Sequence, residues 1–376
     1  MKSIILSLAA ASSAIAITAC ETLSSGSSII EEPESPSIFV SATDGPDIVL
    51  FKDGSRILTL GTGDDVEVSK DPDMHHIAGG CLYTEFTTAT ETVIKKNGEE
   101  LFRYSGREIL KGILVKDEAL YTLGQDKDGQ GFSFRKDGEI LLSNTEGRVW
   151  GDMYEASYSP SGALYEDQGD ICFIYCTGNG RHVSWYAVRE GKEKAFTPPD
   201  AVSDIYDIRR YDGDVCLVAM ESHYRGPVLY IGGRRTDLST SSSVKCGTYR
   251  IHSNDSDFYI SGCISDPGKA ITYLWKAASG SMKAYEGNCP VFMMDGNGTA
   301  CISYCRKEIR YSSDNLGAGS LSGTFKKPSG RTCLFADGVL YIAANPYGTD
   351  KSPILWKDGT EQSFEVDGVL TGISLY

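Results

Sequence analysis

The sequence predicts an all-β fold, an eight-bladed β-propeller, and three observations lead to this prediction. A short apolar strand that runs into a Lys-Asp-Gly or Lys-Asn-Gly turn recurs at residues 49–54, 93–98, 132–138 and 354–359. Units of this kind repeat at an interval of about 40 to 45 residues, which is the period of propeller blades. The end of the chain can supply a strand that the first unit lacks.

The turns explain why these segments form hairpins. Asp-Gly and Asn-Gly are strong hairpin signals, because a type I′ turn requires positive φ at both central residues. The 41 glycines and 21 tyrosines suit many short strands joined by tight turns. No segment has a sustained 3.6-residue apolar period with caps, so we expect almost no helix.

Each unit should contain an apolar strand followed by a partner strand. The first of the two is predicted at residues 38–41, 81–86, 120–123, 171–176, 215–219, 258–263, 300–305 and 339–343. The partner is predicted at residues 48–51, 92–95, 132–135, 183–188, 228–231, 271–275, 308–311 and 354–356.

The ends of the domain are expected to pair with each other. The first unit has no inner strand, and residues 368–376 look like the inner strand at residues 109–115. A C-terminal strand that completes the first blade would leave no unpaired edge between the termini. The seventh unit, near residues 289–325, is degenerate and contains a loop-like Gly-Ala-Gly-Ser run, so seven blades are an alternative. Two packed β-sandwiches fit less well, because sandwiches do not repeat at a fixed interval.

The N-terminal residues have the features of a targeting segment. Residues 1–19 are predicted to be a signal peptide, because Lys2 precedes an apolar run that is too short for a permanent membrane span. Residues 20–37 are rich in Ser, Glu and Pro and are predicted to form a flexible tether. Residues 38–376 are predicted to form the propeller domain.

The stretch Ile17-Thr18-Ala19-Cys20 and the repeats together resemble the β-propeller lipoproteins of Gram-negative bacteria. The resemblance implies that Cys20 becomes the lipidated N-terminus of an outer-membrane lipoprotein in the cell envelope. The membrane would then be a partner, and we expect a monomer. An ordinary secretory signal with an incidental cysteine is the alternative. The chain lacks the Trp-Asp ends of WD repeats and the Gly-Gly doublets of kelch blades, and the resemblance carries no catalytic residue with it.

Charge and cysteine spacing exclude several function classes. A net charge of -15 argues against a nucleic-acid partner, which requires a basic face. Cys172 and Cys176 lie in one strand-like run and are therefore about 13 Å apart, too far for a mutual disulfide. We expect them to be buried as small apolar residues. No Cys-x-x-Cys pair occurs, and His75 and His76 would face opposite ways on a strand, so we expect neither a metal nor another cofactor.

The ligand-binding candidates lie on loops that a propeller gathers around one mouth of its channel. They are Asp126, Asp128, His182, His223, Tyr224, Arg225 and Tyr347. Aromatic rings with hydrogen-bonding neighbours suit a sugar or a peptide. A calcium loop at Asp126 and Asp128 would need a distal carboxylate, which is absent.

No catalytic motif is present. Residues 319–323 contain two serines between glycines but lack the order and the following helix of a nucleophile elbow, so we expect a flexible loop. The sequence therefore predicts a binding or scaffold module for a glycan, a peptide or an envelope protein. A hydrolase or lyase with its site at the channel mouth is the alternative, and whether the protein is an enzyme stays open. An assembly component that docks through its outer blades is a third hypothesis. An enzyme should show titratable groups with displaced pKa values in one pocket.

Overall fold

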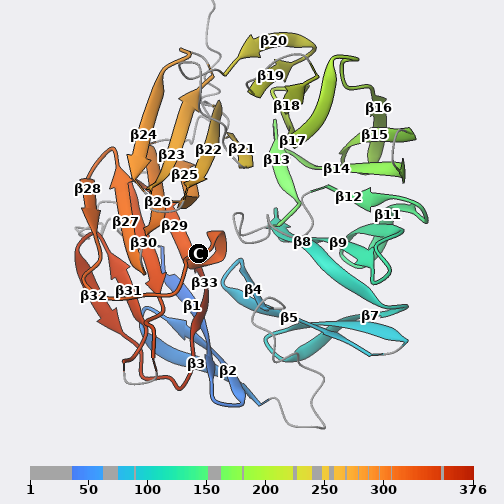
Figure 1. The fold of residues 1–376 in the computed structure, drawn as a ribbon. Coiled ribbons are helices and arrows are strands. Elements are labelled where there is room, and N and C mark those ends of the chain that lie inside the picture. The colour runs from blue at the N-terminus through green and yellow to red at the C-terminus, as the bar shows by residue number, and fades with distance from the viewer. Residues whose placement is uncertain are drawn as a thin grey trace, which may run out of the picture. The chain divides into compact units, whose positions relative to one another are not determined.

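The computed structural model describes residues 36–61, 75–88, 90–150, 162–179, 182–222, 227–238, 248–253, 258–266, 269–277, 279–286, 288–295, 297–305, 307–348 and 351–376. Residues 37–376 form one unit. It consists of eight antiparallel sheets, which we number as blades 1 to 8 (Figure 1).

Each blade is built from an innermost strand outward, and the last strand named is the outermost. Blade 1 contains β33 (Leu370–Leu375), β1 (Ile38–Asp44), β2 (Asp47–Lys52) and β3 (Ser55–Gly61). Blade 2 contains β4 (His75–Ala78), β5 (Cys81–Thr87), β6 (Glu91–Lys96) and β7 (Glu99–Ser105). Blade 3 contains β8 (Glu108–Lys116), β9 (Ala119–Asp126), β10 (Phe132–Lys136) and β11 (Glu139–Asn144). Blade 4 contains β12 (Arg148–Val149) and β13 (Tyr165–Asp167), which both pair with β14 (Asp170–Asn179), then β15 (His182–Arg189) and β16 (Lys192–Phe196).

The second half of the ring repeats this arrangement. Blade 5 contains β17 (Val202–Tyr211), β18 (Asp214–Glu221), β19 (Pro227–Ile231) and β20 (Arg234–Asp237). Blade 6 contains β21 (Thr248–Ser253), β22 (Phe258–Asp266), β23 (Lys269–Lys276) and β24 (Met282–Glu286). Blade 7 contains β25 (Asn288–Asp295), β26 (Gly298–Cys305), β27 (Glu308–Ser313) and β28 (Gly317–Ser320). Blade 8 contains β29 (Cys333–Ala336), β30 (Val339–Ala344), β31 (Ile354–Lys357) and β32 (Thr360–Ser363).

The predicted eight-bladed fold is confirmed, and the seven-bladed alternative is wrong. All eight expected strand pairs form the second and third strands of a blade. The expected loop at the Gly-Ala-Gly-Ser run is instead β28, which pairs with β27 from Arg310↔Ser320 to Ser313↔Gly317. Backbone hydrogen bonds to β27 form this strand although its side chains contribute little to packing. The described residues contain no α-helix, only the 3₁₀ turn η2 (Gly330–Thr332).

The buried cysteines follow the prediction. Cys172 and Cys176 are free thiols, both buried on β14. Cys301 is likewise free and buried on β26. These side chains pack as small apolar groups. No helix among the described residues has the length and apolar character of a membrane span.

The core is divided into eight clusters of buried apolar side chains, one between each pair of neighbouring blades. Leu50 meets Leu82 between blades 1 and 2. Val40 meets Leu355 between blades 8 and 1. Burial of apolar surface at every one of these contacts holds the sheets in a closed ring.

The two ends of the domain close this ring. Strand β33 is the inner strand of blade 1 and pairs antiparallel with β1, with Ile38 opposite Leu375 and Val40 opposite Ile373. Figure 1 shows β33 beside β1. The buried hydroxyls of Ser41 and Thr371 add a hydrogen bond of 2.7 Å across the junction. The predicted closure is therefore confirmed.

The hairpin turns show why the Asp-Gly and Asn-Gly pairs recur. Asp137 and Gly138 have φ values of 48° and 84°, as a type I′ turn requires. Asp137 also clamps the start of the second strand, because its Oδ1 accepts a hydrogen bond of 2.8 Å from the Leu120 amide. In return, the Asp137 amide donates to the Leu120 carbonyl at 2.8 Å.

This two-bond clamp recurs around the ring. It joins Asp53 to Ile38, Asn97 to Leu82, Asp137 to Leu120, Glu190 to Ile171, Asp314 to Thr299 and Asp358 to Leu340. The lysine before the turn has a partner of its own, an aromatic ring directly across the ladder. These cation–π pairs are Lys52 with Phe39, Lys96 with Tyr83, Lys136 with Tyr121, Lys276 with Tyr259 and Lys357 with Tyr341.

The clamp yields a stability prediction. We expect Asp137→Ala to destabilise the protein by about 1 to 2 kcal/mol, because it removes the acceptor for the Leu120 amide and disfavours positive φ. Asp137→Asn should be nearly neutral, since Asn97 performs the same role in blade 2. Urea unfolding of the two variants measures the difference. Equal stability of Asp137→Ala and the natural protein would contradict the role given to the clamp.

Candidate functional site

The predicted ligand-binding residues that the structure describes lie at or between the second and third strands of blades 3, 4 and 8. Asp126 ends β9 and Asp128 lies in the turn that follows, and both are exposed. His182 is the first residue of β15, and only its backbone is described. Three ligand-binding candidates, His223, Tyr224 and Arg225, lie outside the described residues. The predicted lipidation residue, Cys20, also lies outside them.

The structure brings only two of the described candidates together. Loss of hydration around its carboxyl group, and to a smaller extent the charges of Glu108 and Asp128, raise the pKa of Asp126. Tyr347 lies elsewhere, in blade 8, where its ring neighbours Lys307 and Tyr304 of blade 7. These candidates therefore do not form one site in the described part of the chain.

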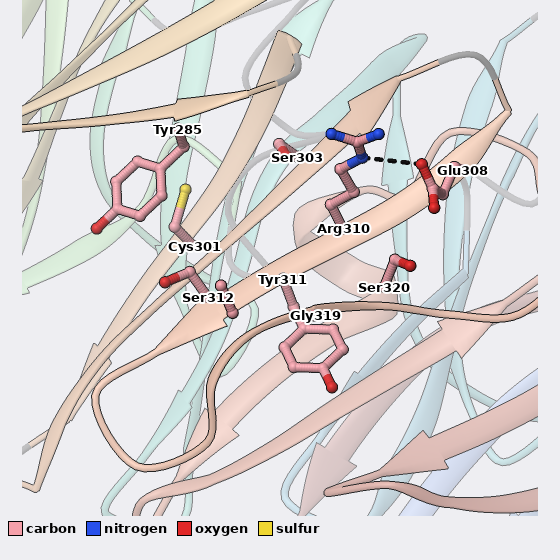
Figure 2. Close-up of a pocket in the computed structure, with 10 residues that line it drawn as sticks. Tyr285, Cys301, Ser303, Glu308, Arg310, Tyr311, Ser312, Gly319 and Ser320 are labelled. Carbon is pink, nitrogen blue, oxygen red and sulfur yellow. Dashed lines mark hydrogen bonds and ion pairs between the residues drawn. The ribbon is translucent and has the colours of Figure 1, made fainter.

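A pocket of ≈ 420 Å³ lies on blade 7 and is lined by residues that the sequence did not single out. Its lining residues are Tyr285, Cys301, Ser303, Glu308, Arg310, Tyr311, Ser312, Ala318, Gly319 and Ser320. In Figure 2, Tyr285 lies at one end and the Arg310–Glu308 pair at the other, with Cys301, Ser303 and Ser312 between them. Strands β26, β27 and β28 supply the floor, and β24 of blade 6 supplies Tyr285.

The pocket exists because one position in the repeat holds a small residue. In each blade, the amide of a turn residue donates to the carbonyl of a residue near the start of the second strand. The position in question is the third-strand residue that pairs with the second-strand residue two places after that carbonyl. This residue is Phe51 in blade 1, Tyr230 in blade 5, Trp275 in blade 6 and Trp356 in blade 8. These four rings fill the contact with the preceding blade. The same position in blade 7 is Ser312, which pairs with Cys301 and leaves the space open.

The outer strand of the pocket is also built from small residues. A Cβ on Gly319 would lie 2.4 Å from the Tyr311 hydroxyl, so a larger residue there would displace that ring. Tyr311 in turn packs on Trp356 of blade 8, with ring centroids 4.6 Å apart. Gly319 of β28 therefore leaves room for the Tyr311 side chain, which packs against Trp356 of blade 8.

The charged groups in the pocket are paired with each other. Arg310 Nε donates to Glu308 Oε2 at 2.8 Å. Hydrogen bonds from Arg310 and then from Ser320 lower the pKa of Glu308, so this carboxylate is ionised at neutral pH. Burial raises the pKa of the Cys301 thiol and of the Tyr285 phenol to about 12 each, which keeps both protonated. The pocket thus offers hydroxyl groups and one ion pair whose charges neutralise each other.

The sequence did contain a signal for this site. The seventh unit is degenerate, and its Ser312 stands where the units of blades 1, 5, 6 and 8 have an aromatic residue. Loss of large apolar residues from one unit of a repeat marks the place where the packing between units opens. Only the register between strands β26 and β27 shows that Ser312 is the residue that leaves the pocket open.

A second polar region lies in the contact between blades 2 and 3, but it is closed. Arg135 occupies the position that corresponds to Ser312 and pairs with Thr122. Its guanidinium binds Glu108 through two hydrogen bonds of 2.6 Å and 2.7 Å, and both side chains are buried. The Tyr104 ring covers the guanidinium at 3.9 Å. Both charged residues belong to blade 3, and Tyr104 of blade 2 is the side chain that packs on this ion pair from the neighbouring blade.

Glu85 lies in the same contact and has only 1% of its surface exposed. Both of its carboxylate oxygens lie 3.1 Å from the Leu110 amide. Burial, and to a smaller extent the charge of Glu108, raise the pKa of Glu85 from 4.5 to about 7. The side chain is therefore largely protonated below neutral pH although it reaches no pocket.

This burial predicts a pH dependence of stability. Between pH 4.5 and about pH 7 the unfolded chain loses the Glu85 proton while the folded protein keeps it, so stability should fall as pH rises through this window. Above it the penalty is complete and on the order of 3 kcal/mol. Glu85→Gln should remove this penalty.

Thermal unfolding of both proteins across this pH range measures the effect. The stability gain of Glu85→Gln over the natural protein should grow from near zero at about pH 4.5 to its full size at about pH 8. A gain that does not change with pH would contradict the raised pKa.

The adjacent histidines His75 and His76 lie on strand β4 and are buried. They pair with Thr84 and Tyr83 of β5 and point to opposite faces. Desolvation lowers the pKa of His76 well below its usual range, with smaller contributions from Arg331 and His75. In the described part of the chain, no group of three or more His, Cys, Asp or Glu side chains has the arrangement of a metal site.

The eight sheets and their closure by β33 define the chain as an eight-bladed β-propeller. No protein-family model matches it, and neither does any curated protein sequence. Dihydro-heme d1 dehydrogenase NirN, solved in complex with DHE, is similar over 92% of this chain and 78% of its own, with a TM-score of 0.54 and 10% identity. Apo AztD from Citrobacter koseri is similar over 91% of this chain and 98% of its own, with a TM-score of 0.53 and 12% identity. At these identities the likeness concerns the fold alone.

Proposed function

We propose that this propeller is a binding module that takes up a neutral, hydroxyl-rich ligand, a glycan, in the pocket on blade 7. The observation that carries the proposal is the lining of that pocket, which presents the hydroxyl groups of Tyr285, Ser303, Ser312 and Ser320. A volume of ≈ 420 Å³ lies within the range of small-molecule sites.

The chemistry of these groups favours a sugar over an apolar or charged ligand. A hydroxyl side chain both donates and accepts hydrogen bonds, as each hydroxyl of a sugar does. An apolar group in the pocket would instead remove such side chains from water without replacing their hydrogen bonds. The Glu308–Arg310 pair neutralises itself, so the pocket has no excess charge that would select an ion.

The pKa values favour binding over catalysis. A hydrolase or lyase needs an acid or base whose pKa lies near the working pH. In this pocket the pKa of Glu308 is lowered and that of Cys301 is raised to about 12. The carboxyl group with a pKa of about 7, Glu85, is buried between blades 2 and 3. No observation in the described residues supports the enzymatic alternative.

A substitution that fills the pocket tests this function. Ser312→Trp places at this position the residue that blades 6 and 8 already have there, so it should abolish glycan binding and keep or raise stability by about 1 kcal/mol. Ser312→Ala leaves the pocket open and removes one hydroxyl, so we expect about a fivefold loss of affinity. A glycan array identifies a ligand, and calorimetric titration with the melting temperature compares the variants.

Two results would contradict the proposal. One is the absence of binding to any glycan by the natural protein. The other is a Ser312→Trp variant that melts at the natural temperature or above and still binds the glycan with unchanged affinity. Because stability is measured on the same sample, loss of binding through misfolding is separated from loss through a filled pocket.

We also propose that the chain is an envelope lipoprotein anchored through Cys20, with the propeller as its exposed binding domain. The support is the Thr18-Ala19-Cys20 sequence after a short apolar run. The Ser-, Glu- and Pro-rich residues 21–35 would give the domain reach from the membrane. Several acyl chains hold a protein at a membrane where one chain is marginal.

Metabolic labelling with a tagged fatty acid in a Gram-negative host tests the anchor. The natural chain should incorporate the label and remain with the membrane fraction, whereas Cys20→Ala should do neither. Cys81→Ala is the matched control, because it removes a thiol from the propeller and should leave labelling intact. Equal labelling of Cys20→Ala and the natural chain rules out lipidation at this residue.

A further inference from the structure

Tyr347 is an exposed aromatic ring that the fold nevertheless holds in place. Its side chain retains 46% of its surface. The Tyr347 amide donates to the Thr324 carbonyl at 3.0 Å. The preceding residue, Pro346, forms a β-bridge with Phe325. The backbone of this loop is thus tied to the segment that connects blades 7 and 8.

The ring itself is held from two sides. The Lys307 ammonium lies 4.5 Å from the centroid of the Tyr347 ring. The Tyr304 hydroxyl donates to the Phe325 carbonyl at 2.8 Å and lies 3.4 Å from the Tyr347 hydroxyl. An exposed tyrosine with its orientation fixed in advance loses little conformational entropy when a ligand packs on it.

The position of this ring relates it to the pocket. Ser303 and Tyr304 are consecutive on β26, so their side chains point to opposite faces of blade 7. Ser303 lines the pocket, and Tyr304 contacts Tyr347. In the same way Lys307, which covers Tyr347, directly precedes Glu308 of the pocket. The pocket and the tyrosine therefore lie on the two sides of one hairpin, β26–β27, near its turn.

We propose that Tyr347 is a second subsite of the same ligand, which makes that ligand a linear oligosaccharide that crosses the β26–β27 hairpin. The inference rests on the proposed glycan function of the pocket. One sugar unit occupies the pocket, and a later unit packs its apolar C–H face on the open part of the Tyr347 ring while Lys307 donates to its hydroxyls. An aromatic surface with adjacent polar donors is the arrangement that fixes a sugar ring.

Linking two such contacts in one ligand should raise affinity with chain length, because the second contact forms at a high effective concentration. The natural protein should therefore bind an oligomer about tenfold more tightly than the monosaccharide. A factor of about ten in affinity is what removal of one well-packed tyrosine contact typically costs. Without the Tyr347 ring, the oligomer and the monosaccharide should bind with similar affinity.

The test uses glucose, N-acetylglucosamine and their linear oligomers, titrated calorimetrically against the full-length chain and four variants. Tyr347→Ala should abolish the gain in affinity with length, and Tyr347→Phe should retain it because the ring remains. Lys307→Asn introduces a residue that tolerates the positive φ of 70° at this position. It should reduce the gain in affinity with length, because it removes the cation over the Tyr347 ring. Tyr376→Ala removes an exposed tyrosine at the chain terminus and should change nothing.

The outcomes separate this inference from the function on which it depends. A gain with length that survives Tyr347→Ala overturns the second subsite, while monosaccharide binding that Ser312→Trp abolishes still supports the pocket. Absence of all saccharide binding overturns both. Binding of oligopeptides in place of oligosaccharides, with the same dependence on Tyr347, overturns the choice of a glycan.

Discussion

Strands β1 and β33 join the two ends of the propeller, and Ser41 and Thr371 bond across this junction although they are 330 residues apart. Every blade packs on two neighbours, so the apolar clusters form a continuous ring only when this junction is made. An open ring would expose one face of blade 1 or blade 8 and two strand edges that other chains could pair with. Closing so long a segment has an entropic penalty, which the clusters together offset.

Within the ring, one position of the repeat decides what lies between two blades. Trp275 and Trp356 fill the space at this position with apolar surface. Arg135 fills it in blade 3 with a charge, which the buried Glu108 neutralises. Ser312 leaves the space empty, and a pocket results. The strand pairing at this position is shared by these blades, so the scaffold stays the same while the chemistry between blades changes. This separation is the general reason why repeat folds carry different sites on one framework.

The chain as a whole has a net charge of -15, yet charges are balanced both in the polar region between blades 2 and 3 and in the pocket. In the contact between blades 2 and 3, Glu85 stays protonated at mildly acidic pH because burial disfavours the charge. In the pocket, Glu308 remains ionised because Arg310 and Ser320 bind it. Glu85 and Glu308 therefore have different roles. One affects how stability responds to pH, and the other provides a fixed acceptor next to a group of hydroxyls.

Local rules in the sequence determined the strands and the turns, and the missing inner strand of the first unit predicted the closure of the ring. Asp-Gly and Asn-Gly pairs require their own backbone geometry, and apolar strands alternate with period two, so neighbouring residues alone are sufficient for these elements. The expected loop at residues 317–320 was wrong, because strand β28 depends on backbone pairing with β27 rather than on its own side chains. The pocket, the buried ion pair and the support of Tyr347 by Lys307 were decided only by the tertiary structure. Each joins residues through the register of a sheet or across two blades, and no spacing along the chain encodes such a distance.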